Sequence, residues 1–334
     1  MPETARRIVL ASRPVGEPKA SDFRLEEFPV PQPGPGQMLL RTKWLSLDPY
    51  MRGRMSDAPS YAKPVGVDEV IEAGTVSEVA ASNNDKYRKG DVVLSRAGWQ
   101  THMLSDGSGL RKLDPAVAPV QTALGVLGMP GMTAYTGLLQ IGAPKAGETV
   151  VVSAASGAVG SAVGQIARIK GARAVGIAGG PDKCRHVTQD LGFDACVDYK
   201  AGNLAADLKA AAPKGIDVYF ENVGGEILDT VLMQMNLFGR IPVCGLISAY
   251  NATSVPEGPK NLRAVLTQRL RMQGLIVFDW ANRIPEAIAQ LGAWHKEGKL
   301  KIREDVREGG LEAFPDVLNL LYTGGNLGKL VLKV

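Results

Sequence analysis

The sequence predicts an α/β protein that joins a small β-rich barrel to a doubly wound, six-stranded parallel sheet. The first part of the chain consists of short strand-like runs between prolines and glycines. From Thr149 onward, β-branched runs alternate with helical patterns. Strands that alternate with helices are typical of a parallel sheet, because parallel strands need a crossover between them. The length of 334 residues agrees with two domains.

The β-rich domain is predicted to hold residues 1–125 and the end of the chain, 305–334. Its expected strands cover 38–45, 74–80, 91–95 and 328–333. A helical pattern over 311–322 precedes the last of these strands. We expect the final helix and strand to rejoin the first domain.

The parallel sheet is predicted within residues 126–304. Its strands are expected at 149–154, 173–178, 195–198, 216–221, 239–245 and 272–278. Helices fill the gaps, and the last one carries a stripe that includes Ile284, Ile288 and Leu291. The polar stretch 251–259 predicts an exposed loop.

Segment 150–165 is the most informative part of the chain. A β-branched run enters a turn of small residues, and a helical pattern leaves it. Such a turn lets backbone N–H groups and a helix N-terminus approach a pyrophosphate. Gly157 and Gly160 allow close backbone approach, and Gly164 allows close packing of the helix. Because Ala155 replaces the usual first glycine, the turn alone fits either a dinucleotide site or an ordinary small-residue turn.

The second predicted strand, 173–178, ends without the carboxylate that usually holds the ribose hydroxyls in an NAD site. Gly179 follows it, and Lys183 and Arg185 come soon after. An acid at the strand end would repel a 2′-phosphate, whereas cations would accept one. The sequence therefore predicts NADP(H) rather than NAD(H), with Lys183 as the phosphate partner. A solvated lysine on the next helix is the alternative.

Composition and charge exclude several classes of protein. The formal net charge of +4 comes from scattered residues and gives no case for nucleic acid. The first residues lack the apolar stretch of a signal peptide, and no apolar run is long enough for a membrane span. The three cysteines show no CxxC spacing, which predicts reduced thiols and a cytoplasmic protein.

Several further motifs carry a resemblance that covers nearly the whole chain. They are Asp48–Arg52, Gly128–Tyr135, Glu221–Gly225, Cys244–Asn251 and Asn326–Lys329. With them, the chain resembles the zinc-independent branch of the medium-chain dehydrogenase/reductase superfamily. That branch comprises leukotriene and prostaglandin reductases, plant double-bond reductases and bacterial curcumin reductases, and the bacterial group is the most similar through Pro59–Tyr61 and Ala178–His186. The resemblance implies a GroES-like β-rich domain and a Rossmann domain.

The residue types predict no metal site. Zinc members of the superfamily bind the metal through thiolate and imidazole ligands. No cysteine precedes Cys184, and the histidines His102, His186 and His295 lie far apart in the chain. His102 is expected to be a surface or barrel-packing residue. Without a metal to polarise an alcohol, alcohol oxidation is a poor candidate reaction.

The resemblance implies NADPH-dependent reduction of the C=C bond of α,β-unsaturated ketones and aldehydes. Hydride reaches the β-carbon, and one or two hydrogen-bond donors stabilise the charge that collects on the carbonyl oxygen. By resemblance, Tyr250 faces the substrate as such a donor, and Tyr50 and Tyr61 line the substrate cleft. Ordinary packing is the alternative for each tyrosine. Arg52 and Arg54 are expected to be solvated and are assigned no role.

The same resemblance assigns the cofactor contacts. They are Thr133, Ala155, Gly157, Val159, Gly160, Gly179, Lys183, Tyr199, Asn222, Cys244, Leu246, Ile247, Tyr250, Phe278 and Asn326. Ala155, Gly157 and Val159 would cradle the pyrophosphate, and Asn326 would cap it from the C-terminal segment. Lys183 and Tyr199 would flank the 2′-phosphate and ribose, and Asn222 would lie near the adenosine. Thr133, Cys244, Leu246 and Phe278 would lie near the nicotinamide half. Cys244 is expected to be a buried apolar residue of a strand rather than a nucleophile.

Two other functions remain open at this point: an NADPH quinone oxidoreductase and a non-catalytic NADPH-binding protein. A comparison of an enone with a small quinone would separate the two reductases. The resemblance also implies a homodimer that joins its sheets through the last parallel strand. The only other partner expected is a small unsaturated carbonyl substrate.

Overall fold

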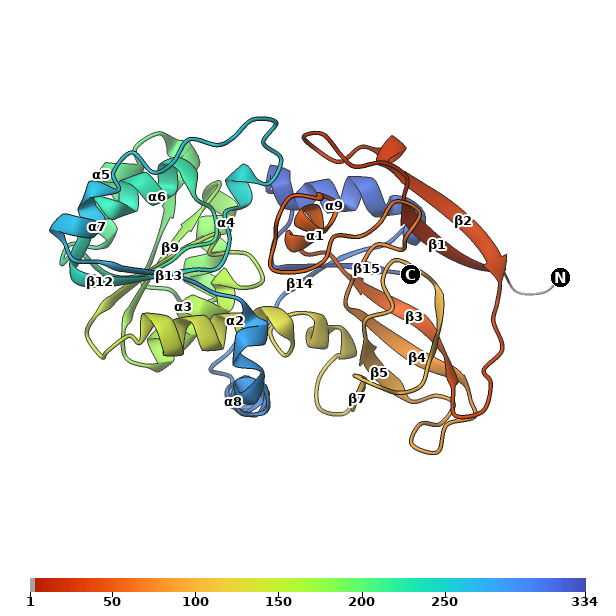
Figure 1. Ribbon diagram of the computed structural model, residues 1–334. Coiled ribbons are helices and arrows are strands. Elements are labelled where there is room, and N and C mark those ends of the chain that lie inside the picture. The colour runs from red at the N-terminus through yellow and green to blue at the C-terminus, as the bar shows by residue number, and fades with distance from the viewer. Residues whose placement is uncertain (1–3) are drawn as a thin grey trace. The chain divides into compact units, whose positions relative to one another are not determined.

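The computed structural model describes residues 4–334 and divides the chain into two compact units (Figure 1). One unit holds the residues up to Leu124 together with Glu304–Val334. The other unit holds Gly125–Arg303. Within the described residues, no helix combines the length and the apolar character that a membrane span requires.

Antiparallel pairing dominates the first unit. Its larger sheet has the order β14-β15-β3-β4-β5-β7, and β6 pairs with β3. These strands are β3 (Met38–Ser46), β4 (Thr75–Ser82), β5 (Val92–Ser95), β6 (His102–Ser105), β7 (Arg111–Leu113), β14 (Glu304–Arg307) and β15 (Lys329–Lys333). A separate pair is formed by β1 (Thr4–Leu10) and β2 (Phe23–Pro29). Because β15 pairs with β3, the end of the chain joins a sheet that begins near residue 38.

Short helices complete this unit and close its core. They are η1 (Ala20–Asp22), α1 (Tyr50–Arg54), η2 (Val120–Leu124), η8 (Leu311–Ala313) and α9 (Phe314–Thr323). Phe314, at the start of α9, packs edge-on against Trp99 and Phe23. His102 is buried in β6, so of its two expected placements barrel packing is right.

The second unit is built on a parallel sheet with the order β10-β9-β8-β11-β12-β13. The strands are β8 (Thr149–Ser153), β9 (Arg173–Ala178), β10 (Ala195–Asp198), β11 (Ile216–Phe220), β12 (Met235–Val243) and β13 (Arg271–Gly274). In chain order this is the 3-2-1-4-5-6 arrangement of a doubly wound dinucleotide-binding sheet. The strand order reverses between β8 and β11, and ligands of such sheets bind at that point.

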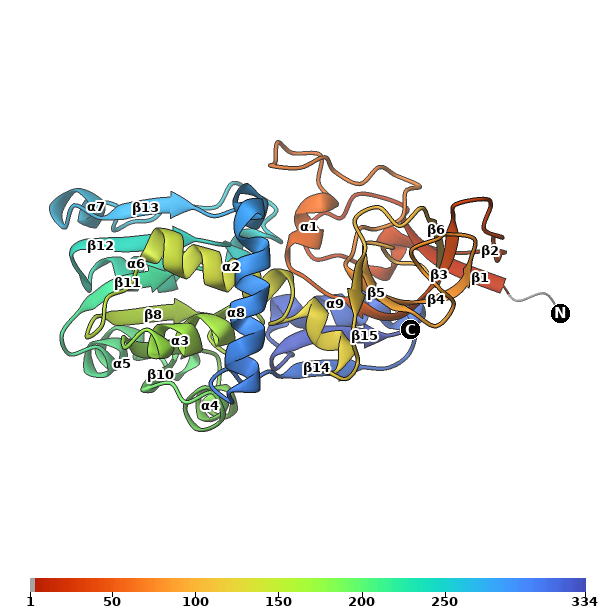
Figure 2. The same ribbon diagram turned by 90° about the horizontal axis from the view of Figure 1, so that it is seen from below.

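Helices cover both faces of this sheet. One face carries α2 (Met129–Thr136), the π-helical segment η3 (Gly137–Gly142), α3 (Gly160–Ile169) and α8 (Ile284–Lys296). The other carries α5 (Leu204–Ala211), α6 (Gly225–Leu232) and α7 (Arg263–Thr267). Figure 2 shows α2, α3 and α8 crossing the same side of the strands. The valines of β8 alternate between the two cores, because successive side chains of a strand point to opposite faces.

Shorter elements connect these layers. They are α4 (Pro181–Arg185), η4 (His186–Asp190), η5 (Tyr199–Ala201), η6 (Ile247–Ala249) and η7 (Val277–Arg283). The predicted loop 251–259 is an exposed loop in the structure.

Two predicted strands of the parallel sheet differ from the structure by more than one residue at an end. The strand expected at 239–245 begins at Met235 and ends at Val243. The strand expected at 272–278 pairs only over Arg271–Gly274, and the chain is helical again from Val277. The apolar run after Gly274 resembles a strand, and the N–H of Leu275 still bonds to the carbonyl oxygen of Val243 (2.9 Å). The side chain of Leu275 fills the core beside Phe220, and the chain becomes helical two residues later. Tertiary packing overrides local β-propensity here.

Gly164 provides a test of this packing. A Cβ at Gly164 would lie 1.9 Å from Cζ of Phe193, a buried side chain. Gly164→Ala should therefore lower the free energy of unfolding by about 1–3 kcal/mol, because one side chain must move in a closely packed core. Urea unfolding followed by circular dichroism measures the change.

Gly292→Ala is the matched control, because Gly292 lies in α8 and a Cβ there meets nothing within 4 Å. It should be neutral or stabilise the protein by about 0.5–1 kcal/mol, since alanine favours the helix over glycine. Equal stability of the two variants would contradict the packing described here.

Candidate functional site

The turn after β8 lies where the strand order reverses. Ala154 adopts a left-handed conformation with φ +51°, and its carbonyl oxygen accepts the N–H of Gly157 at 2.9 Å. A Cβ at Gly160 would lie 2.3 Å from that carbonyl oxygen, so only glycine lets α3 begin so close to the turn. The side chain of Ala155 is fully buried, so this residue offers only its backbone to a ligand, and Val159 is the residue before α3.

Side chains join the ends of β8 and β11 at the centre of the sheet. The hydroxyl of Ser153 donates to Oε1 of Glu221 (3.0 Å) and accepts the N–H of Asn222 (2.9 Å). The side-chain amide of Asn222 donates to the carbonyl oxygen of Ser153 (2.8 Å). Oε1 of Glu221 also accepts the N–H of Val223 (2.5 Å). These bonds fix the turn that follows β11 against the end of β8.

Residues 221–223, which follow β11, fix the loop 244–250 after β12 by backbone hydrogen bonds. Backbone carbonyl groups of the turn accept loop N–H groups at 2.9–3.2 Å. The pairs are Cys244 and Gly245 to Glu221, Ile247 to Asn222, and Ser248 to Val223. The loop then folds back on itself, because the hydroxyl of Tyr250 accepts the N–H of Leu246 at 3.4 Å. The structure thus brings Cys244, Leu246, Ile247 and Tyr250 into one loop beside Asn222.

Burial controls the charges at this end of the sheet. Burial raises the pKa of the Glu221 carboxyl, whereas the N–H groups of Val223 and Gly224 and the Ser153 hydroxyl lower it. Burial and the charge of Glu221 raise the pKa of Cys244 to about 12. The Cys244 thiol is therefore protonated at neutral pH and a poor nucleophile. It lies one residue beyond β12, so its expected position within the strand is wrong.

Small residues and a lysine surround the ends of β9 and β10. Gly179 follows β9, Lys183 lies half-buried in α4, and Tyr199 follows β10. The carboxylate of Asp198 accepts the N–H of Gly180 at 2.7 Å. A Cβ at Gly179 would lie 2.9 Å from the ring of Tyr199, so glycine permits this close approach. No residue from Arg173 to Gly180 is acidic, and the Asp198 carboxylate that lies at this end accepts the backbone N–H groups of Gly180 and Lys200.

Thr133 and Phe278 lie on two neighbouring elements of the same unit. Thr133 is in α2, where its hydroxyl donates to the carbonyl oxygen of Met129 (2.8 Å). Phe278 is in η7, which packs against α2, and its side chain is 46% exposed. Phe278 therefore lies on a helical turn rather than on the strand predicted for it.

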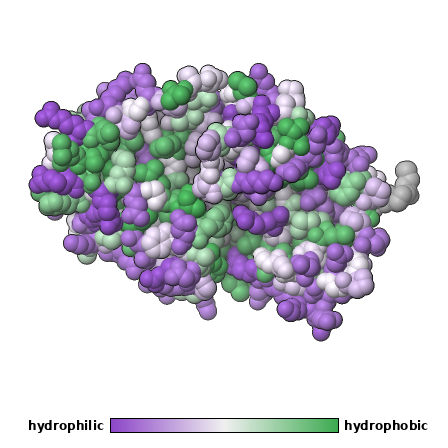
Figure 3. Space-filling model, viewed as in Figure 1, coloured by the Kyte–Doolittle hydropathy of each residue, from purple (hydrophilic) through white to green (hydrophobic). Residues whose placement is uncertain are grey.

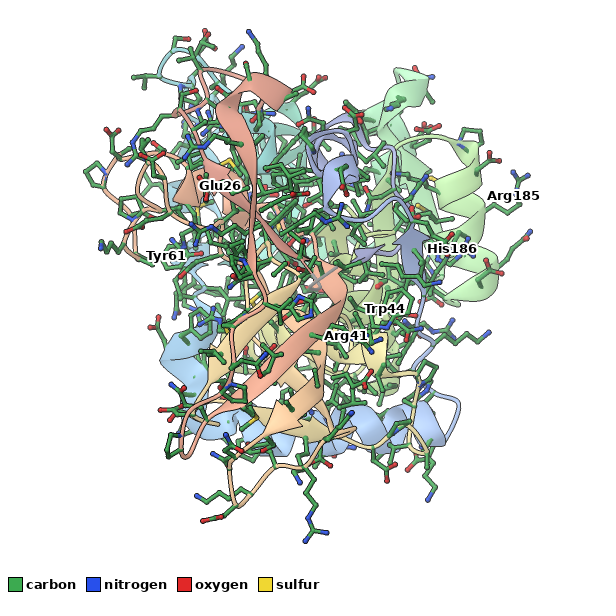
Figure 4. The ribbon with its side chains drawn as sticks, turned by 90° about the vertical axis from the view of Figure 1, so that its right-hand side faces the viewer. Glu26, Arg41, Trp44, Tyr61, Arg185 and His186 are labelled. Carbon is green, nitrogen blue, oxygen red and sulfur yellow. The ribbon has the colours of Figure 1, made fainter. Side chains whose placement is uncertain are left out.

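Two of the tyrosines assigned to the substrate belong to the β-rich unit, and Arg54 links them. The guanidinium carbon of Arg54 is 5.6 Å from the ring centroid of Tyr50 and 4.6 Å from that of Tyr61. Arg54 is 5% exposed, whereas Tyr61 is 55% exposed (Figure 4). Burial and the nearby Asp48 raise the pKa of Tyr50, so its phenol stays protonated. A cation between two aromatic faces keeps both rings in place.

The expectation that Arg52 and Arg54 are solvated is wrong. Both side chains are buried. The guanidinium of Arg52 donates to the carbonyl oxygens of Pro14 and Gly16, each at 3.1 Å. Arginine hydrogen-bonded in this way is structural, and it fixes the helix that carries Tyr50.

A buried ion pair connects the Asn326 segment with α1. The ammonium group of Lys329 donates to the carboxylate of Asp48 (2.6 Å) and to the carbonyl oxygen of Leu47 (2.7 Å). Burial lowers the pKa of Lys329, and the carboxylate opposes that effect. The side-chain amide of Asn326 donates to the carbonyl oxygen of Gly328 (3.0 Å). The ion pair therefore sets where Asn326 and Tyr50 lie within this unit.

Comparison with known proteins follows the same division of the chain. A family model described as the N-terminal domain of oxidoreductase matches residues 6–113, and one described as zinc-binding dehydrogenase matches residues 158–293. NADPH-dependent curcumin reductase from Escherichia coli (strain K12) is 53% identical over 98% of this chain and 96% of that protein. The chain belongs to the medium-chain dehydrogenase/reductase family.

Two further relatives refine the branch and the fold. The NADP(+)-dependent 2-alkenal reductase from Nicotiana tabacum is 41% identical over 98% of this chain and 97% of that protein. The crystal structure of CurA from Vibrio vulnificus in complex with NADPH has a TM-score of 0.93 and 51% identity, covering 98% of this chain and 99% of that chain. The predicted branch is confirmed, and so is the predicted pairing of a GroES-like domain with a Rossmann domain.

Whether this chain can hold a zinc ion depends on the cysteine and histidine ligands that it offers. Members of the family that bind zinc use cysteine and histidine ligands, and residues 1–183 contain no cysteine. Among residues 4–334, no three His, Cys, Asp or Glu side chains are grouped as a metal ion would require.

The side chains that hold the site together were not predicted from the sequence. Ser153 ends the buried strand β8, and Glu221 directly follows the buried strand β11. A polar residue at the carboxyl end of such a strand was the available signal. Arg54 gave no signal, because nothing local distinguishes a buried arginine from a solvated one.

Glu221 predicts a pH effect on stability. Its pKa in the folded protein is raised above the ordinary value of 4.5. The stability it contributes is therefore fully present below that value and is lost as the pH rises through the raised pKa. Glu221→Gln keeps the shape of the neutral acid and removes this titration. The melting temperature of the native protein minus that of the variant should fall as the pH rises from 4.

Thermal unfolding of both proteins from pH 4 to 8 measures this difference. A difference that increases with pH would show that the folded protein favours the carboxylate, contrary to the burial described here.

Proposed function

We propose that this protein reduces the C=C bond of α,β-unsaturated ketones and aldehydes with NADPH as the hydride donor. The observation that carries the proposal is the 53% identity to a curcumin reductase. The glycine turn after β8, and a β9 whose own residues include no acid, support it. NADP(H), the cofactor expected from the sequence, is the cofactor in the names of the curcumin and 2-alkenal reductases and the ligand of the CurA structure.

Each part of the cofactor has residues suited to it. The turn 154–160 would receive the pyrophosphate on its backbone, and Gly179, Lys183 and Tyr199 would surround the 2′-phosphate. The loop 244–250 would support the nicotinamide half. Asn222 acts chiefly as a positioning residue, because its amide group is committed to Ser153.

The chemistry requires a site for negative charge. Bound NADPH supplies a hydride to the β-carbon of the enone. Tyr250 donates a hydrogen bond to the carbonyl oxygen as charge collects there, since a phenol is a neutral donor at pH 7. Tyr50 and Tyr61, held by Arg54, offer flat faces for a planar conjugated substrate.

We further propose a cytoplasmic homodimer that joins its parallel sheets at β13. In the part of the chain that is described, β13 is the terminal strand of its sheet and has β12 as its neighbour. Leu262 and Leu266, which precede β13, are exposed apolar residues. Figure 3, viewed from the side of β13, shows hydrophobic side chains among the polar ones on this unit. The cytoplasmic location is supported by the absence of CxxC pairs among the three cysteines.

Lys183→Ala tests the phosphate assignment. The variant should raise KM for NADPH at least roughly tenfold, because it removes a charge-assisted contact. KM for NADH should change little, since NADH carries no 2′-phosphate. Lys209→Ala, the same change on an exposed residue of α5, is the control and should alter neither value. Equal effects of Lys183→Ala on both cofactors would remove the assignment.

Tyr250→Phe tests the reaction. With trans-3-nonen-2-one as substrate, kcat should fall on the order of a hundredfold, as expected when an oxyanion donor is lost. KM for NADPH should stay nearly constant, because the ring remains. The assay follows the loss of NADPH absorbance with chelator-treated enzyme and includes a small quinone as a second substrate. An unchanged kcat would exclude Tyr250 as the donor, and turnover of the quinone alone would replace the proposed reaction.

A further inference from the structure

Two cysteines lie against each other at the end of the sheet where the 2′-phosphate is proposed to bind. Cys184 is in α4 and Cys196 is in β10, and their sulfur atoms are 3.0 Å apart. Both are free thiols, and both are partly exposed. The third cysteine, Cys244, is on another loop after β12.

We propose that Cys184 and Cys196 form a reversible disulfide, and that this disulfide weakens the binding of NADPH. The second part rests on the proposed role of Lys183. The first part rests on the proximity of the two sulfur atoms alone.

The two thiols differ in reactivity. The Cys196 thiol donates a hydrogen bond to the Cys184 sulfur, which lowers the pKa of Cys184, while Cys196 has its own pKa raised. The two residues that follow Cys184 mark the two sides of this segment: Arg185 is exposed and points away from the ribbon, and His186 is buried (Figure 4). Because its pKa is the lower of the two, Cys184 is the attacking thiolate in this proposal, and Cys196 is the thiol that it can pair with.

A peroxide would be the oxidant. The Cys184 thiolate attacks one oxygen of hydrogen peroxide, the O–O bond breaks, and Cys184 becomes a sulfenic acid while hydroxide leaves and takes a proton from solvent to form water. The Cys196 sulfur then attacks the Cys184 sulfur, the S–O bond breaks, and the departing hydroxyl takes the proton of the Cys196 thiol and leaves as a second water. Two electrons pass from the two sulfur atoms to the peroxide. A dithiol reductant reverses the change by thiol–disulfide exchange.

The disulfide would act on the cofactor through neighbouring residues. A disulfide bond is about 2.05 Å long, so the sulfur atoms must approach by roughly 1 Å. Lys183 directly precedes Cys184 in α4, and Asp198, which accepts the N–H of Gly180, lies two residues after Cys196. Gly180 is held to β10 through Asp198. When the disulfide draws Cys184 toward β10, Lys183 therefore moves relative to Gly180.

The test treats the full-length protein with hydrogen peroxide and removes the excess. Thiol titration in denaturant should fall from the 3 cysteines of the sequence to one. After tryptic digestion, mass spectrometry should find the dipeptide Cys184-Arg185 linked to the peptide 186–200. KM for NADPH should rise roughly tenfold, a change of about 1.4 kcal/mol in binding, while KM for NADH stays nearly constant. Dithiothreitol should restore the original value.

Cys184→Ser and Cys196→Ser are the matched variants. Each should keep the untreated activity and lose the response to peroxide. Three remaining thiols, or a disulfide that includes Cys244, would overturn the proposed pair. A Cys184–Cys196 disulfide with an unchanged ratio of the two KM values would overturn the effect on NADPH. The KM values of reduced Lys183→Ala for NADPH and for NADH separate this last result from a failure of the phosphate assignment. If Lys183→Ala raises KM for NADPH alone, the assignment holds and only the effect of the disulfide fails.

Discussion

The carboxyl group of Glu221 is the interaction on which the cofactor half of this protein depends. It lies fully buried at the end of β11, next to the point where the strand order reverses. Its side chain accepts hydrogen bonds from Ser153 and Val223, and its backbone carbonyl group accepts the first N–H groups of the loop after β12. Three strand ends are thereby tied to one residue. The hydrogen bonds to Oε1 offset part of the cost of burying this carboxyl, so the surrounding turns have little freedom.

A similar device organises the β-rich unit. Lys329 and Asp48 form an ion pair with almost no exposure, and each belongs to a segment that carries a proposed site residue. Buried pairs add little net stability, because both charges lose their hydration. Their effect is on geometry, since either charge without its partner would be strongly unfavourable. In both units, buried polar contacts fix the loops, whereas the apolar cores hold the sheets.

Much of this architecture follows from local patterns in the sequence. The alternation of β-branched runs and helical stripes predicted all six parallel strands, because the period of the side chains differs between strand and helix. Gly160 was predicted to let a pyrophosphate approach the backbone, which stays a prediction, and the structure adds that glycine is also required there by the Ala154 carbonyl oxygen. Other features depend on contacts between distant segments. The chain becomes helical at Val277, soon after Leu275 has packed beside Phe220, and Arg54 is buried beside two tyrosines. Local sequence reveals neither feature.

The central claim is that hydride reaches a carbon–carbon double bond. The most direct test is the reduction of trans-3-nonen-2-one with NADPH that carries deuterium at both C4 positions of the nicotinamide, followed by NMR of the product. The account predicts nonan-2-one with one deuterium on the β-carbon and none on the carbonyl carbon. Deuterium on the carbonyl carbon, in an allylic alcohol, would contradict it.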